Sequence, residues 1–279
     1  MNNNRPLPEF HQKRETGEIF SASFAFLRNG AGPLLKHILV YVIPIIALYA
    51  FAQVSLSIKI TEATGILKET DPEILMQRLS GLYGNFLVII FFSAFVQSLL
   101  ASVVYSHMQL IYHKGRDNYS SAEFSAILFS NSSKAVLTGI IVAALSLVGL
   151  MLCILPGILL ANSLSMAVFI AIFEGKGTGY SLARSWMLVR RNWWATFSLN
   201  LSGLVFVWMA GIATSLPVAL YDLISGAGAG ASPEVTDIPQ WRWWVSGISI
   251  VISSLAAVVP IVFMASSLCF RAISFSISV

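Results

Sequence analysis

Charged residues are scarce in this chain of 279 residues. Asp, Glu, Lys and Arg make up 11% of the sequence, whereas soluble domains contain roughly a quarter. Hydrophobic residues make up 56%. A soluble protein of this length has too few charged groups here to cover its surface, so the surrounding medium has to be lipid. The composition therefore predicts an integral membrane protein.

Cysteine, clustered histidine and continuous basic segments are also missing. The two cysteines, Cys153 and Cys269, lie within apolar runs, which argues against a disulfide framework. The four histidines show no HExxH or similar spacing, so we expect no metal site. Basic residues flank apolar runs, so we expect no nucleic-acid partner. The glycine-rich SGAGAGASPE segment follows no strand, so we expect no nucleotide and no other cofactor.

Apolar runs long enough to cross a bilayer indicate an all-α fold with six transmembrane helices in three hairpins. The first 16 residues are polar and are expected to form a disordered cytoplasmic tail, with no cleaved signal. Residues 17–279 are expected to form one membrane domain. Its predicted spans are 34–57, 85–112, 135–154, 157–173, 193–221 and 243–270.

The third and fourth spans come from a single apolar run, 135–173. As one helix this run measures nearly 60 Å, about twice the thickness of the hydrocarbon core. It is therefore expected to fold back. Proline removes a helical donor and glycine permits a turn, so the break is predicted at Pro156 and Gly157.

Lys and Arg predict the orientation of the spans. Thirteen of the 17 basic residues fall in the N-terminal region, the 113–134 and 174–192 loops and the C-terminal end. Only Lys59, Lys68, Arg78 and Arg242 fall on the other side. This bias predicts that both termini are cytoplasmic.

The segment SLARSWMLVRRNWWATF combines arginine with tryptophan. On a helix, Leu182, Trp186, Val189 and Trp193 form one stripe, and Arg184 and Arg191 face away from it. This pattern is typical of a helix in the headgroup layer. Similar interfacial helices are predicted at 18–31, 120–131 and 179–192, each before a hairpin, which suggests three related units. The stripe at 120–131 begins at Phe124 and is interrupted at Asn131.

Residues 155–197 carry a family resemblance. Leu155-Pro156-Gly157, Glu174, Ala183-Arg184-Ser185-Trp186 and Trp193-Trp194 together resemble the membrane domain attached to some bacterial glycerophosphodiester phosphodiesterases. The resemblance implies a helical integral-membrane fold in the inner (cytoplasmic) membrane of a bacterium. It does not imply the phosphodiesterase activity, which belongs to a separate barrel domain of roughly 250 residues for which this chain has no room.

Two groups of residues are candidates for a site. Glu174 and Arg184 either pair across the EGKG turn or act separately, at a span end and a lipid surface. Three arginines and three tryptophans are expected to contact membrane lipids, either as general anchors or by binding the headgroup of an anionic phospholipid. These are Arg184, Arg190, Arg191, Trp186, Trp193 and Trp194.

The predicted spans contain no Asp, Glu, Lys or Arg at their centres, which argues against an ion-coupled pump. The polar residues at depth are amides, which more often connect helices than bind substrate: Gln53, Gln97, Gln109, Asn162 and Asn200. We therefore expect a scaffold or accessory subunit with a membrane protein partner and no enzymatic activity. The alternative is a transporter or lipid-handling protein for an amphiphilic or phosphoglycerol-type substrate. A wide cavity open sideways to lipid and lined by Asn162, Asn200 and Gln97 would favour the alternative.

Overall fold

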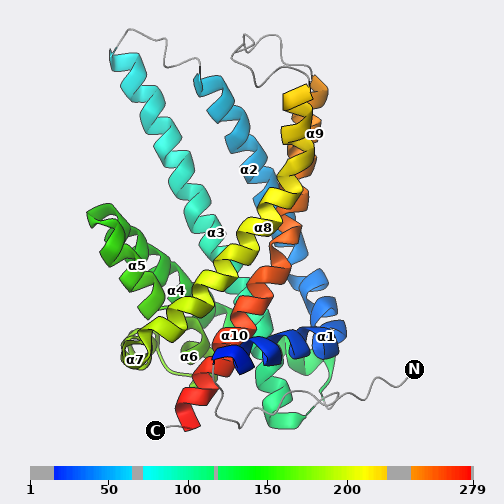
Figure 1. Ribbon diagram of the computed structural model, residues 1–279, viewed down its shortest axis with the longest axis vertical. Helices are drawn as coiled ribbons and strands as arrows, with labels where there is room; N and C mark the ends of the chain where they lie inside the picture. The colour runs from blue at the N-terminus through cyan, green and yellow to red at the C-terminus, as the bar shows by residue number, and fades with distance from the viewer. Residues whose placement is uncertain (1–15, 65–71, 116–118, 225–239, 278–279) are drawn as a thin grey trace. The chain divides into compact units, whose positions relative to one another are not determined.

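The computed structural model describes residues 16–64, 72–115, 119–224 and 240–277, and every regular element in these ranges is an α-helix (Figure 1). Five helices are long and apolar enough to cross a membrane, and a bent pair raises the number to six. The helices are α1 (Thr16–Tyr41), α2 (Ile43–Thr64), α3 (Pro72–Lys114), α4 (Ser121–Leu152), α5 (Ile154–Ser163), α6 (Ala167–Phe173), α7 (Thr178–Arg191), α8 (Trp193–Ile224), α9 (Gln240–Ala256) and α10 (Val258–Ile277).

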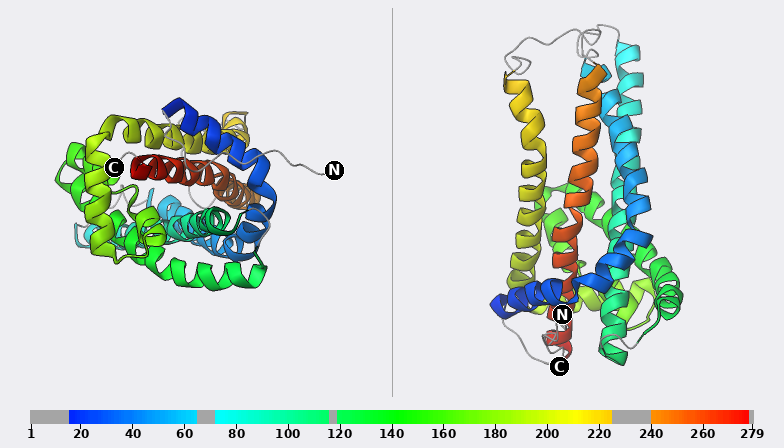
Figure 2. Two further views of the ribbon diagram at one scale, coloured as in Figure 1. Left: turned by 90° about the horizontal axis from the view of Figure 1, so that it is seen from below. Right: turned by 90° about the vertical axis from the view of Figure 1, so that its right-hand side faces the viewer.

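The chain forms two compact units. The first comprises Met1–Val42, Ala94–Phe206 and Val259–Val279, and the second comprises Ile43–Ser93 and Val207–Val258. In the second unit α2 packs against α9, and the hydroxyls of Thr214 and Ser253 lie 2.7 Å apart. In the first unit α1 runs across α10 (Figure 2), where Phe24 and Phe263 have ring centroids 4.6 Å apart.

Three of the helices that follow another helix after a break of one residue have a proline in their first turn. Pro44, Pro156 and Pro260 are the second or third residues of α2, α5 and α10. The first amides of a helix have no partner within that helix, so a residue without an N–H is tolerated there. A helix that arrives from the N-terminal side cannot continue through the same residue without losing a hydrogen bond. Proline therefore explains the breaks at Val42, Cys153 and Ala257.

One predicted boundary is wrong for this reason. The helix expected to end at residue 31 continues to Tyr41, and the bend of 53° between Gly32–Tyr41 and Ile43–Leu56 falls at Val42. The last predicted span, 243–270, agrees with a candidate span over Gly247–Ile273, although a turn at Ala257 divides it between α9 and α10. Pro33 is accommodated inside α1.

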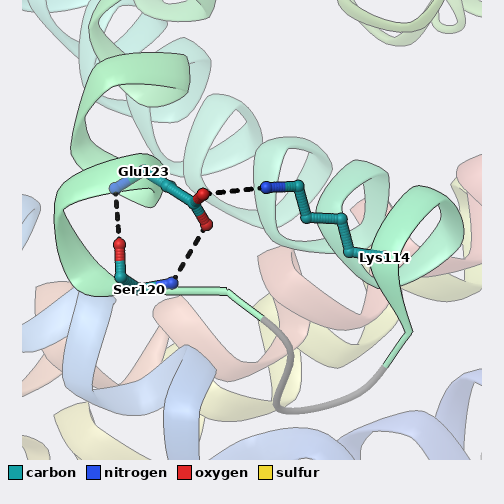
Figure 3. A network of polar contacts seen from close by, with 3 residues as sticks. All are labelled: Lys114, Ser120 and Glu123. Carbon is teal, nitrogen blue, oxygen red and sulfur yellow. Dashed lines mark hydrogen bonds and ion pairs between the residues drawn. The ribbon is translucent and has the colours of Figure 1, made fainter.

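The separate interfacial helix predicted at 120–131 is also wrong, because α4 runs without a break from Ser121 to Leu152. The Ser120 hydroxyl accepts a hydrogen bond from the Glu123 amide at 3.2 Å, and the Glu123 carboxylate accepts one from the Ser120 amide. Lys114 Nζ lies 2.9 Å from the same carboxylate (Figure 3). This capping box fixes the start of α4.

Asn131 does not interrupt the buried face of α4. Its Nδ2 donates to Ser106 Oγ at 2.9 Å and to Gln109 Oε1 at 3.1 Å, both on α3. Ser102 Oγ and Ser132 Oγ lie 3.2 Å apart on the same two helices. A buried amide with partners on the neighbouring helix stabilises the contact, so the helix has no reason to break there.

The turn predicted at Pro156 and Gly157 lies three residues earlier, at Cys153. This residue is extended, with φ −171° and ψ 152°, between α4 and α5. Gly157 instead permits a close approach: a Cβ there would lie 2.5 Å from Leu150 Cγ. Gly149 faces Gly157 across the same contact. Pro156 and Gly157 both lie close to the break, as the sequence predicts. However, Gly157 allows α4 and α5 to pack closely, and Pro156 lies in the first turn of α5.

Candidate functional site

The fourth predicted span is interrupted by a turn at Leu164–Met166, between α5 and α6. A turn inside an apolar segment leaves backbone carbonyls without their helical partners. Here the Asn162 carbonyl accepts from Ser165 Oγ at 2.8 Å and from the Ser165 amide at 3.3 Å. The Ser163 carbonyl accepts from Ser185 Oγ of α7 at 2.8 Å. Side-chain hydroxyls therefore replace the lost backbone bonds.

The Asn162 side chain connects this interruption to α8. Its Oδ1 accepts a hydrogen bond from Asn200 Nδ2 at 2.8 Å. Its Nδ2 donates to the Trp193 carbonyl at 3.4 Å. Asn162 is 3% exposed, and both ends of its amide bond groups on α8. We call Asn162, Ser163, Ser165, Ser185 and Asn200 the interruption cluster.

α7 joins the cluster through a face of small residues. Ser181, Ser185 and Val189 are spaced four residues apart and are 0% exposed. Small side chains let the helix approach closely. At the beginning of α7, Thr178 Oγ1 lies 3.2 Å from Thr138 Oγ1 of α4.

The residues of the predicted stripe on α7 differ in their burial. Val189 is fully buried, whereas Trp186 is 40% exposed, so the two do not lie on a common exposed face. Leu182 and Trp193 are half-buried. Periodicity alone favours the large apolar side chains for the inner face. The serines occupy it because one of them completes the interruption of the neighbouring helices.

The structure brings Glu174 and Arg184 together. Arg184 Nε lies 3.8 Å from Glu174 Oε1, and both side chains are about one third exposed, 32% for Arg184 and 35% for Glu174. Gly175 makes the intervening turn possible because its φ is +64°, which other residues rarely adopt. Tyr180 adds a hydrogen bond to Glu174, which raises the pKa of Tyr180 above its ordinary value.

The remaining predicted lipid contacts lie at the C-terminal end of α7 and the beginning of α8. Arg190 and Arg191 are exposed, and Trp194 is 76% exposed. Trp193 stacks on Phe197 with ring centroids 4.9 Å apart. The chain changes direction between the helices at Asn192, with φ −138° and ψ 51°. In Figure 1 α7 is seen end-on and α8 from the side.

A second cluster contains two histidines, His37 and His107, whose proximity the sequence does not predict. His107 Nδ1 lies 2.7 Å from the Tyr119 hydroxyl. His37 stacks on Phe124 with ring centroids 3.6 Å apart and lies 6.1 Å from the His107 ring. The group packs α1 against α3 and the beginning of α4. Within the described ranges, no three His, Cys, Asp or Glu side chains are placed to hold a metal ion. His11 lies outside those ranges.

Sequence analysis does not identify Ser163, Ser165 and Ser185 as members of a site. Serine is frequent throughout the apolar runs, and its spacing carries no signal for a turn whose carbonyls need a donor. Comparison of the chain with protein-family models, with curated proteins and with solved structures gives no match. Function therefore has to be inferred from the residues and their contacts.

Proposed function

We propose that this protein is a scaffold or accessory subunit of the bacterial cytoplasmic membrane and catalyses no reaction. The observation that carries the proposal is the use of polar side chains within the apolar helices. Asn162 bonds Asn200, and Asn131 bonds Ser106 and Gln109. A substrate pathway needs such groups to face an open space, whereas these groups hold helices together.

Contacts in the second unit support the same conclusion. Ser249 Oγ donates to the Thr214 carbonyl at 3.1 Å, and the Thr214 and Ser253 hydroxyls lie 2.7 Å apart. These bonds join α8 to α9. Hydroxyls and amides that connect neighbouring helices give a firm framework on which a partner protein can assemble.

The proposed scaffold carries α7 in the cytoplasmic headgroup layer. Trp186, Met187, Arg190 and Arg191 are exposed, and this combination of side chains suits the boundary between lipid headgroups and acyl chains. The bend at Asn192, which turns α7 away from the direction of α8, supports this placement. The first half of α1, which runs across α10 (Figure 2), is proposed to lie in the same layer.

One observation favours the alternative of a lipid-handling or transport protein. The turn at Leu164–Met166 interrupts a candidate span, and interrupted helices often mark binding sites in transporters. In that case the substrate is amphiphilic, because the described spans offer amides and hydroxyls at depth. The resemblance to a phosphodiesterase membrane domain makes a phosphoglycerol group the natural polar part of such a substrate.

The test compares three proteins purified in mild detergent: the wild type, Asn162→Leu/Asn200→Leu, and the matched control Thr214→Val/Ser253→Val. Each double variant removes both side chains of one polar pair, so neither side chain of that pair is left without the other. A scaffold retains the same partner protein, at the same ratio, in all three. A stoichiometric amphiphile in the wild type that is lost only from the Asn162/Asn200 variant would establish the alternative and overturn the scaffold.

A further inference from the structure

The turn between α4 and α5 has an unusual surface. Met151, Leu152, Ile154 and Leu155 are 77%, 79%, 68% and 71% exposed. From residue 147 to residue 161 the sequence contains no charged, hydroxyl, amide or aromatic side chain. We call residues 148–159 the apolar tip. Two other segments between predicted spans differ in composition: residues 61–73 and 222–242 both contain several carboxylates.

The apolar tip has no residue suited to a headgroup layer. Trp, Tyr, Lys and Arg are the usual anchors where a helix leaves the bilayer. The nearest charged residues are Lys134 and Glu174, about 20 residues from the turn on either side. An exposed apolar surface without anchors is stable in hydrocarbon and unfavourable in water.

Contacts with α7 show how far the tip extends from that helix. Ser163, the last residue of α5, accepts the hydrogen bond from Ser185 of α7. α5 has 10 residues, which corresponds to about 15 Å. Along α4, the contact between Thr138 and Thr178 lies 15 residues before Cys153, or about 22 Å. Both lengths are shorter than the hydrocarbon core of about 30 Å.

The backbone of the turn is suited to a place without water. The Cys153 amide donates to the Gly149 carbonyl at 3.0 Å, and the Gly157 amide donates to the Cys153 carbonyl at 3.2 Å. Pro156 has no amide hydrogen, which removes one of the donors that the first turn of α5 would otherwise leave without a partner. The turn therefore leaves fewer amide groups without a partner than a turn without these two bonds and this proline.

We propose that α4 and α5 form a re-entrant hairpin whose apolar tip ends inside the hydrocarbon core and is covered by the acyl chains of lipids. The hairpin enters and leaves on the side of α7, so this inference rests on the proposed position of α7 in the headgroup layer. The occupant is lipid because the tip is exposed all around its end, whereas a protein partner usually covers one shaped face. Four crossings remain, and both termini stay on one side.

The experiment uses Cys153 as a reporter in the full-length chain, with Cys269→Ser to leave a single thiol. A membrane-impermeant maleimide is applied to intact cells and to inverted vesicles. Met187→Cys and Ser232→Cys, each in a cysteine-free background, report the two aqueous sides. Position 187 is expected to be labelled from one side of the membrane and position 232 from the other. Cys153 is expected to be labelled from neither side and to react once the protein is unfolded in denaturing detergent.

A second measurement gives the depth directly. A nitroxide attached to Cys153 in reconstituted vesicles is expected to be accessible to oxygen and protected from a water-soluble nickel complex. Labelling of Cys153 from the side opposite position 187 would show a hairpin that crosses, and labelling from the same side would show a tip outside the bilayer. Disulfide cross-linking of Cys153 between two copies would show that a second copy covers the tip. Each of these three results overturns the proposal. If position 187 labels from neither aqueous side, the proposed position of α7 fails separately.

Discussion

Ser185 Oγ donates a hydrogen bond of 2.8 Å to the carbonyl of Ser163. This bond joins the middle of α7 to the last residue of α5, at the place where the apolar segment 154–173 is interrupted. It gives the carbonyl a partner after the regular helix ends. It also sets the position of α7 relative to the hairpin of α4 and α5.

Replacement of Ser185 by Ala is expected to destabilise the protein by about 1–3 kcal/mol, because it leaves the buried Ser163 carbonyl without its donor. Ser181→Ala is the matched control. Ser181 is equally buried, but its hydroxyl bonds the Gly177 carbonyl at the start of its own helix. Thermal unfolding in detergent measures the difference. Equal loss in the two variants would contradict a specific role of the Ser185–Ser163 bond.

Gly157→Ala is expected to destabilise the α4–α5 hairpin by about 1–3 kcal/mol through overpacking. The new Cβ would lie 2.5 Å from Leu150 Cγ and 2.7 Å from its Cα. Gly211→Ala in α8 is the control, because a Cβ there meets nothing within 4 Å. Alanine also favours a helix over glycine by about 0.5–1 kcal/mol. The control is therefore expected to match or exceed wild-type stability in the same unfolding assay.

Leu152→Lys tests the environment of the apolar tip. A lysine in the hydrocarbon core opposes insertion by about 2.5–3.5 kcal/mol, so the level of folded protein in the membrane is expected to fall sharply. Met187→Lys, at an exposed position of α7, is expected to be tolerated. Membrane fractionation and quantitative blotting measure both. Normal levels of the Leu152→Lys protein would indicate that the tip lies in water or among headgroups.

Glu174→Gln is expected to reduce stability by less than about 1 kcal/mol, because the ion pair with Arg184 is long and partly exposed. The more specific effect concerns Tyr180. Its hydrogen bond to Glu174 raises its pKa and favours the protonated phenol. This contribution is complete below the ordinary tyrosine pKa and disappears as pH rises through the raised value.

Spectroscopic titration of tyrosinate can detect that interaction. The titration of Tyr180 is isolated as the difference between each protein and its Tyr180→Phe counterpart. In Glu174→Gln the pKa of Tyr180 is expected to fall toward its ordinary value. An unchanged titration would show that the Glu174 carboxylate does not accept a hydrogen bond from the Tyr180 hydroxyl. The measurement is independent of any change in folding stability.

Arg190→Ala/Arg191→Ala is expected to weaken the attraction of α7 for anionic lipid, by about 1 kcal/mol for each basic residue near the surface. The affinity of detergent-purified protein for vesicles is a poor measure, so native mass spectrometry of retained phospholipid is preferable. Arg184→Ala/Arg191→Ala distinguishes headgroup binding from general anchoring. Equal retention of anionic and neutral lipid by the wild type would leave only general anchoring.

Several features follow from the residues alone. The low charge and the long apolar runs predict a helical membrane protein, and the structure confirms an all-helical chain, within its described ranges, with five or six helices able to span a membrane. α7 and α8 begin within one residue of the ranges expected from the sequence. α7 is amphipathic and α8 is apolar, so the change in composition between them marks their boundary in the sequence. Orientation, the three related units and the family resemblance remain predictions.

The structure corrects the other boundaries because of contacts between segments distant in the sequence. In the sequence, Asn131 interrupts the apolar stripe that begins at Phe124. In the structure, Ser106 and Gln109 accept hydrogen bonds from Asn131, and α4 continues. Pro156 and Gly157 signal a turn, but the turn comes at Cys153 because proline is better tolerated once the new helix has begun. The conformational preferences of single residues indicate roughly where a helix breaks, and packing between helices decides at which residue it ends.

The low charge and the long apolar runs by themselves predicted a membrane protein made of helices, since a bilayer admits few other backbones. Only the tertiary structure decided which polar residues meet. Asn162 pairs with Asn200 across 38 residues, and Ser163 with Ser185 across 22. A sequence shows which face of a helix is polar, but a hydrogen bond also depends on the helix opposite that face. The apolar tip also depends on tertiary contacts, because its distance from α7 follows from the Ser163–Ser185 bond and the length of α5.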